Sequence, residues 1–142
     1  MREKLKIVVV MGTLDTKGPE LVYLAQQVRS AGCLALLMDV GVHGDSGLKA
    51  DIPASTVAAA VGEEISSICA LPRGEAVEKI GRAAAAYLHQ MIESGEAHGV
   101  VGVGGSGGKT ICAAAMRALP YGIPKMIVST LASGNTRWHV DI

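Results

Sequence analysis

The sequence predicts an α/β protein built on a Rossmann-like, doubly wound parallel sheet of about four or five strands. Two observations lead to this prediction. Short, continuously apolar segments rich in β-branched residues, such as Leu5–Met11 and Leu34–Val40, are typical of strands that are buried on both faces of a parallel sheet. These segments alternate with helical patterns, and such alternation favours helices packed on both faces of the sheet.

Composition excludes several other classes of protein. The chain has 142 residues, enough for one domain, and with 49% hydrophobic and only 18% charged residues it does not resemble a disordered protein. Its 13 basic residues balance its 13 acidic residues, so binding to bulk nucleic acid is not expected. No apolar stretch approaches the roughly 20 residues of a membrane span. Three widely spaced cysteines without a Cys-x-x-Cys pair indicate free thiols in a cytoplasmic protein.

The first forty residues predict a strand, a helix and a second strand. The polar segment after the first strand ends in Gly18-Pro19, and a proline at the first helical position predicts that the helix starts there. Either Asp15 or Thr16 is then the expected helix cap. Gly32 is expected to close this helix, and the second strand follows at once, which implies a parallel crossover.

The remaining chain predicts two more strands and three more helices. Their expected bounds are a short helix over 54–61, a long helix over 75–93, a strand over 98–103, a helix over 110–119 and a strand over 125–130. No element is assigned between 62 and 74. No covering helix follows the fourth strand, although an open parallel sheet needs helices on both faces. Residues 1–142 are therefore expected to form a single nucleotide-binding subdomain, truncated at its C-terminal end and part of a larger protein.

Three loops after predicted strands carry the candidate site residues, because open α/β sheets bind ligands beyond the carboxyl ends of their strands. The loops contribute, in order, Thr13, Asp15, Thr16 and Lys17; Gly104, Gly105, Ser106, Gly107, Gly108 and Thr110; and Ser129, Thr130, Ser133 and Gly134. The second loop is the most informative. Its glycines leave backbone N–H groups unobstructed ahead of a helix N-terminus, which together predict a phosphate site. A tightly packed turn is the alternative interpretation.

Two familiar nucleotide motifs do not fit this second loop. A P-loop ending in Gly108-Lys109-Thr110 would require glycine at position 103, where the chain has Val103. The dinucleotide pattern G-x-G-x-x-G is present from Gly102, but no acidic residue ends the next strand to hold a ribose. Phosphate binding without either motif remains the prediction, with Lys17 and Lys109 as candidate phosphate contacts.

Three further functions are considered. Ser106 fits a G-x-S-x-G nucleophile elbow, but only His139 and Asp141 follow it, in the wrong order for a hydrolase triad. A non-catalytic protein-interaction or dimerisation domain is the main alternative to nucleotide binding. His43 stands near two aspartates at a strand end, but this spacing is unspecific, so a solvated loop is preferred and no metal site is predicted.

Five segments in this order resemble the ATP-binding domain family of the plant tobamovirus-resistance protein and its bacterial relatives. They span almost the whole chain and are Gly12–Glu20, Asp39–Val42, Gly104–Gly108, Met116–Pro120 and Ser129–Gly134. The resemblance implies ATP as the ligand, with or without Mg²⁺, a second subdomain after this one, and a homo-oligomer. The chain departs from the family pattern by inserting Lys109 before Thr110 and by carrying Arg137–Val140 where the family has Pro-Tyr-Val-Gly.

Overall fold

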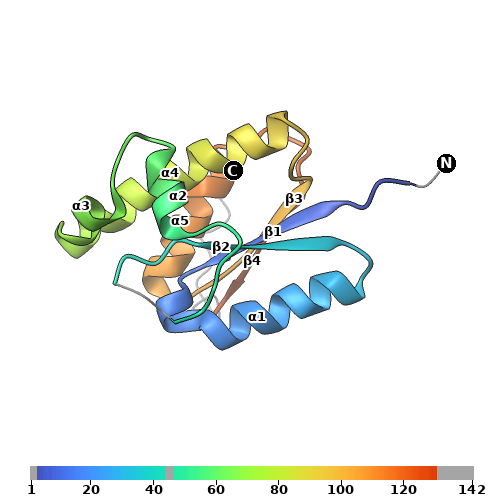
Figure 1. The fold of residues 1–142 in the computed structure, drawn as a ribbon, viewed down its shortest axis with the longest axis horizontal. Coiled ribbons are helices and arrows are strands. Elements are labelled where there is room, and N and C mark those ends of the chain that lie inside the picture. The colour runs from blue at the N-terminus through green and yellow to red at the C-terminus, as the bar shows by residue number, and fades with distance from the viewer. Residues whose placement is uncertain (1–2, 44–46, 131–142) are drawn as a thin grey trace.

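Four parallel strands form the sheet that organises the described part of the chain, which is residues 3–43 and 47–130 of the computed structural model. The strands are β1 (Ile7–Gly12), β2 (Leu34–Asp39), β3 (Gly99–Gly104) and β4 (Lys125–Ser129), and their order across the sheet is β2-β1-β3-β4 (Figure 1). Every pairing is parallel. The predicted α/β class with a parallel sheet is therefore confirmed.

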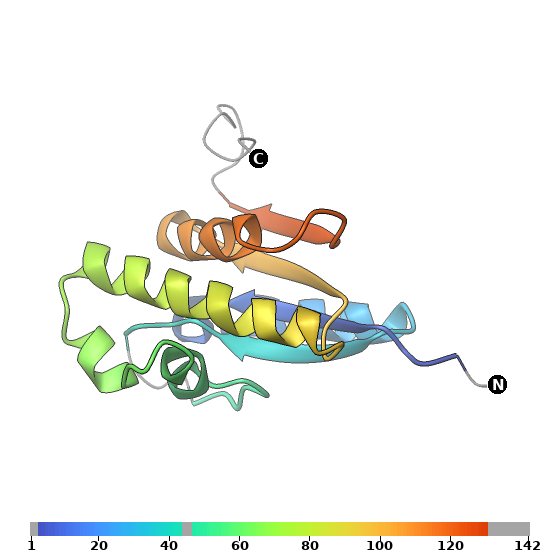
Figure 2. The same cartoon turned by 90° about the horizontal axis from the view of Figure 1, so that it is seen from above.

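Helices cover both faces of this sheet, as Figure 2 shows from above. The helices are α1 (Leu14–Ser30) on one face and α2 (Ala54–Ala59), α3 (Ile65–Cys69), α4 (Arg73–Glu93) and α5 (Ser106–Arg117) on the other. Val9 and Val10 in β1 are both fully buried, because successive side chains of a strand point to opposite faces and each face has its own helical layer.

The order of the strands reverses between β1 and β3. The chain passes from β1 to β2 on one side, then returns across β1 through α2, α3 and α4 to place β3 on the other side. Gly12 at the end of β1 is thereby in register with Val103 near the end of β3. Loops after β1 and β3 start side by side at the carboxyl edge, which is where doubly wound sheets bind ligands.

Helix α1 begins at Leu14, five residues before the predicted first helical position, Pro19. Its first turn starts at Leu14, and the backbone then leaves helical geometry at Lys17, with φ −126° and ψ 25°. The break arises because Pro19 has no N–H for the carbonyl of Asp15 and its ring crowds that carbonyl. The predicted caps are also wrong: Thr13 occupies the N-cap position, and its side chain makes no capping hydrogen bond.

Helix α5 also begins earlier than predicted, in this case by four residues. It starts at Ser106, so Gly107 and Gly108 belong to its first turn, whereas the sequence predicted a glycine-rich turn over 104–108. The physical reason is close packing of α5 against the end of β3. A Cβ on Gly104 would lie 2.4 Å from the backbone nitrogen of Lys109, so only glycine lets the helix turn back this tightly.

Two further features of the structure, helix α3 and the exposure of strand β4, were not predicted from the sequence. Helix α3 lies in the segment to which no element was assigned. Strand β4 is largely exposed, with Met126 63% and Val128 47% exposed, because α1 packs over β1, β2 and β3. The sequence expected no helix after this strand, and residues 131–142 lie outside the described residues.

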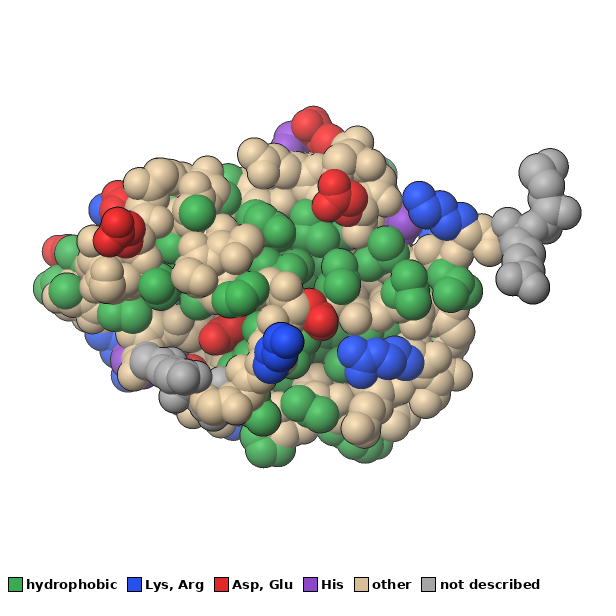
Figure 3. Space-filling view, in the orientation of Figure 1, with side chains coloured by type: hydrophobic (Ala, Val, Ile, Leu, Met, Phe, Trp, Pro, Cys, Tyr) green, Lys and Arg blue, Asp and Glu red, His purple; other side chains and the backbone are tan. Residues whose placement is uncertain are grey.

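No helix in the described ranges is both long and apolar enough to cross a membrane. On the face shown in Figure 3, apolar side chains gather along the middle, and basic and acidic side chains are scattered among them without a large patch of one sign.

Candidate functional site

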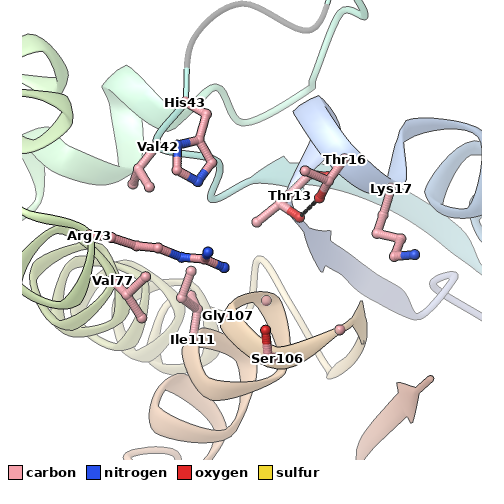
Figure 4. Close-up of a pocket in the computed structure, with 12 residues that line it drawn as sticks. Thr13, Thr16, Lys17, Val42, His43, Arg73, Val77, Ser106, Gly107 and Ile111 are labelled. Atoms are coloured by element: carbon pink, nitrogen blue, oxygen red, sulfur yellow. Dashed lines mark hydrogen bonds between the residues drawn. The ribbon is translucent and has the colours of Figure 1, made fainter. Parts of the chain in front are cut away.

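A cavity of about 200 Å³ opens at the carboxyl edge of the sheet, where the strand order reverses (Figure 4). It brings together residues from the loops after β1, β2 and β3 and from two helices of one layer. Its lining consists of Thr13, Thr16, Lys17, Val42, His43, Arg73, Val77, Gly105, Ser106, Gly107, Gly108 and Ile111. Seven of these twelve residues are among the site residues predicted from the sequence.

The first turn of α5 forms one wall of this cavity. Gly105 is the N-cap residue, and no side chain makes a capping hydrogen bond at this end. The first N–H groups of an α-helix have no partner within the helix, so the amides of Ser106, Gly107 and Gly108 are available to a ligand. An uncapped helix N-terminus carries a partial positive charge, and this wall is therefore suited to an anion.

The glycines of this segment have two different roles. Gly104 is required by packing, as described above, and is buried at the end of β3. Gly105 and Gly107 have room for a Cβ: the nearest atoms would be Thr130 Oγ1 at 3.7 Å and Arg73 Nη2 at 3.4 Å. None of these three glycines has a positive φ. Packing therefore explains Gly104, whereas Gly105 and Gly107 leave backbone open toward the cavity.

The first turn of α1 forms a second wall. The hydroxyls of Thr13 and Thr16 are hydrogen-bonded to each other at 2.5 Å, as the dashed line in Figure 4 marks. Lys17 stands at the break in α1, where the chain leaves helical geometry before it continues from Pro19. Two hydroxyls and an ammonium group thus border the cavity opposite α5, and all three can bind phosphate oxygens.

The third wall comes from residues that the sequence did not place at the site. Val42 and His43 follow β2, Arg73 and Val77 lie in the first two turns of α4, and Ile111 lies one turn into α5. The position of His43 after a predicted strand could have identified it as a site residue. No such signal marks Arg73 in the sequence, because it lies more than thirty positions from every predicted site residue. It reaches the cavity only through the packing of α4 against α5.

Two carboxylates organise the loops without lining the cavity. Asp39 Oδ1 accepts hydrogen bonds from the backbone nitrogens of Leu14 at 3.1 Å and Gly41 at 2.9 Å. Asp15 Oδ2 accepts one from the nitrogen of His43 at 3.2 Å. Asp15 Oδ1 is buried and makes no hydrogen bond within the described ranges. Asp15 thus ties the loop after β2 to the loop after β1, where the sequence predicted a ligand contact.

The other predicted site residues lie outside this cavity. Gly104 is buried beneath it, and the Thr110 hydroxyl donates to the Ser106 carbonyl at 2.9 Å within α5. Ser129 is the last residue of β4. Thr130 follows it, and its Oγ1 lies 3.7 Å from the point that a Cβ on Gly105 would occupy. Ser133 and Gly134 lie outside the described residues, as do the His139 and Asp141 of the hydrolase alternative. Ser106 lines the cavity, and no hydrogen bond joins it to a histidine within the described ranges.

A larger hollow of about 760 Å³ lies along the side of α5 and over β4. It is lined by aliphatic residues such as Met116, Leu119 and Ile127, with Lys109 and Lys125 at its border. Lys109, a predicted phosphate contact, therefore borders this hollow and not the smaller cavity. Among residues 3–43 and 47–130, no three His, Cys, Asp or Glu side chains gather into a group that could hold a metal ion.

Comparison with known proteins shows the family of this chain. Residues 6–142 match the model of the uncharacterised protein family UPF0261, N-terminal domain. The chain belongs to this family. It is similar to a UPF0261 protein of Rhizobium meliloti, with 45% identity over 97% of this chain and 34% of the relative. It is also similar to one of Clostridium tetani, with 39% identity over 95% of this chain and 34% of the relative.

A plant relative extends the comparison. The tomato (Solanum lycopersicum) ToMV resistance protein Tm-1 is 34% identical over 92% of this chain and 19% of its own length. The resemblance to plant and bacterial proteins expected from the five sequence segments is thus confirmed at the level of the family. The chain spans about a third of the length of the bacterial relatives that it matches.

Proposed function

We propose that this chain is a nucleotide-binding module of the UPF0261 N-terminal type that holds the phosphates of ATP against the first turn of α5. One observation carries the proposal: the cavity lies at the reversal of strand order, and one of its walls is an uncapped helix N-terminus with unpaired amides. Doubly wound sheets bind nucleotides at this position, with the phosphates at a helix N-terminus.

The size of the cavity limits which part of ATP it receives. A volume of about 200 Å³ is below the range of roughly 300–1,000 Å³ that is usual for pockets enclosing a whole small molecule. The phosphate chain carries the negative charge of ATP, and the partial positive charge at the N-terminus of α5 attracts it. We therefore place the phosphates inside the cavity, with the ribose and base extending past His43 or Lys17 at its border.

Side chains opposite α5 supply the remaining contacts in this proposal. Lys17 offers a positive charge, and the hydroxyls of Thr13, Thr16 and Ser106 offer donors to phosphate oxygens or oxygen ligands to a phosphate-bound Mg²⁺. The three cysteines are free thiols. Free thiols and a nucleotide ligand suit a reducing, cytoplasmic setting, which is part of the same proposal.

Calorimetry with ATP, in the presence and absence of Mg²⁺, tests this function on the full chain. A Gly105→Leu variant is expected to lose ATP binding. Its side chain would project from the N-cap position beside the backbone N–H groups that are proposed to bind the phosphates. Ala118→Leu, at the exposed far end of α5, is the matched control and should bind as the wild type does. Absence of ATP binding by the wild type, or equal binding by both variants, would show the proposal to be wrong.

A second candidate function is assembly with another protein chain, including a second copy. It is favoured by the exposure of Met126 and Val128 and by the apolar hollow beside β4. Light scattering over a range of concentrations tests it. A single monomeric species at the highest concentration would argue against self-association.

A further inference from the structure

Arg73 occupies an unusual position in the cavity. It is the first residue of α4, and its side chain extends from that helix into the space between His43 and the start of α5 (Figure 4). Its Nη2 atom lies 3.4 Å from the point that a Cβ on Gly107 would occupy. The guanidinium therefore faces the first turn of α5 at close range.

The two helix ends beside Arg73 do not favour a cation, although the first turn of α4 also carries Glu75. The N-terminus of a helix carries partial positive charge, and Arg73 stands in the first turn of one helix while facing the first turn of another. No hydrogen bond or ion pair joins it to a residue in the described ranges. Arg82, two turns further along α4, differs in that it forms an ion pair with Glu78 at 2.6 Å.

The described residues of the cavity offer Arg73 no counter-charge. Within residues 3–43 and 47–130, the lining includes Lys17, His43 and Arg73 but no aspartate or glutamate. The carboxylates of Asp15 and Asp39 accept hydrogen bonds from backbone nitrogens of the loops after β1 and β2. A positively charged cavity with one uncapped helix end is balanced when an anion with at least two negative charges enters it.

We propose that Arg73 binds a phosphate group directly, with the phosphate seated between its guanidinium and the amides of Gly107 and Gly108. This inference rests on the proposed nucleotide binding and adds a ligand contact from α4. A guanidinium presents two parallel N–H groups to two phosphate oxygens, which a lysine cannot do. The contact would join α4 and α5 through the ligand and needs no bridging metal ion.

The test compares three variants of the full chain by calorimetry with pyrophosphate and with ATP, both in EDTA. Arg73→Gln removes the charge, Arg73→Lys keeps the charge without the two parallel donors, and Arg82→Gln is the matched control on the same helix. Arg73→Gln is expected to weaken both ligands by about tenfold or more, since a hydrogen bond between charged groups is lost. Arg73→Lys should lie between this variant and the wild type, and Arg82→Gln should bind normally.

The outcomes separate this inference from the proposed function. Equal affinities of wild type and Arg73→Gln, or wild-type binding that disappears in EDTA, would overturn the direct contact and leave ATP binding in place. Pyrophosphate binding that depends on Arg73, without ATP binding, would support the contact and overturn the nucleotide proposal. If the wild type binds neither ligand, either in EDTA or with Mg²⁺, both are wrong. Circular dichroism of each variant shows that a loss of binding does not reflect unfolding.

Discussion

Two hollows adjoin α5, and they differ in almost every property except that both have cationic borders. The smaller one, about 200 Å³, lies at the N-terminus of the helix, where loops from three strands converge. The larger one, about 760 Å³, lies along the side of the helix beside the edge strand β4 and is lined mainly by aliphatic side chains. Lys17 and Arg73 border the first, and Lys109 and Lys125 border the second.

We infer from this difference that position in the fold is a better guide to a candidate ligand site than volume is. The small hollow brings together the unpaired backbone amides of α5 and the hydroxyls of Thr13 and Thr16, which bond to each other. Such polar groups orient a polar ligand. The large hollow offers apolar area, which drives association with another apolar surface but orients little. The first is therefore suited to a small anion and the second to a protein segment.

The largest expected effect comes from breaking the small hollow at its base. In Gly104→Val the new Cβ would lie 2.4 Å from Lys109 N and 2.5 Å from Gly108 C, so the start of α5 must move away from β3. We expect the free energy of unfolding to fall by roughly 3 kcal/mol. Gly105→Ala, with its nearest neighbour at 3.7 Å, is the control and should be much less affected in urea denaturation. Equal losses of stability in the two variants would contradict the conclusion that close packing requires glycine at position 104 but not at position 105.

A second prediction concerns Cys112, which is buried where α5 contacts the sheet. Burial of Cys112 at this contact raises the pKa of its thiol from an ordinary value of 9.0 to about 12. Above pH 9 the unfolded chain therefore loses a proton that the folded chain keeps, so stability falls as the pH rises. The expected slope is about 1.4 kcal/mol per pH unit between pH 9 and 12.

Urea denaturation at several pH values measures this slope. Cys112→Ala should remove the contribution of one thiol from it, whereas Cys69→Ala, which alters an exposed cysteine, should leave the slope unchanged. An identical pH dependence in wild type and Cys112→Ala would contradict the prediction.

A third variant adds the missing negative charge to the small hollow. Gly107→Asp places a carboxylate in the first turn of α5, facing Arg73. It should be more stable than Gly107→Asn, which matches it in shape but lacks the charge, by about 0.5 kcal/mol. The difference should shrink at high salt and in an Arg73→Gln background. Thermal denaturation gives both comparisons, and no difference between Asp and Asn would mean that the cavity is not electropositive.

The smallest effect on stability is expected at the large hollow. Met126 is 63% exposed, so Met126→Glu should change the free energy of unfolding by less than about 0.5 kcal/mol. It should leave ATP affinity unchanged and weaken any self-association seen by light scattering. Lys17→Gln is the reciprocal control, with weaker ATP binding and an unchanged oligomeric state. A loss of ATP affinity in Met126→Glu would show that the two hollows are not independent.

Sequence patterns predicted the strands well but misplaced the starts of two helices, α1 and α5. The strands are short apolar segments whose burial leaves a direct trace in composition, so each was predicted to within about two residues. Both misplaced helix starts, at Leu14 and Ser106, involve residues that usually mark turns. Glycine and threonine disfavour helix locally, but packing of each first turn against a strand end outweighs that preference.

The candidate site shows the same division. Residues directly after a strand, such as Thr13 and Ser106, were predictable because the carboxyl edge of a parallel sheet gathers the loops that follow its strands. Val77 and Ile111 were not predicted, because their helical spacing marks them only as residues of a buried face. Lys109 was misplaced because one step along a helix rotates a side chain by about 100° from its neighbour, away from the cavity.

The sequence by itself determined the alternation of strands and helices, the apolar layers and the family of this chain. These properties depend on local composition and spacing, which every segment carries with it. Only the tertiary structure decided the strand order β2-β1-β3-β4, the meeting of α4 with α5 and the position of Arg73 opposite Gly107. These depend on contacts between segments far apart in the chain, and the free energy of such contacts arises only when the chain has folded.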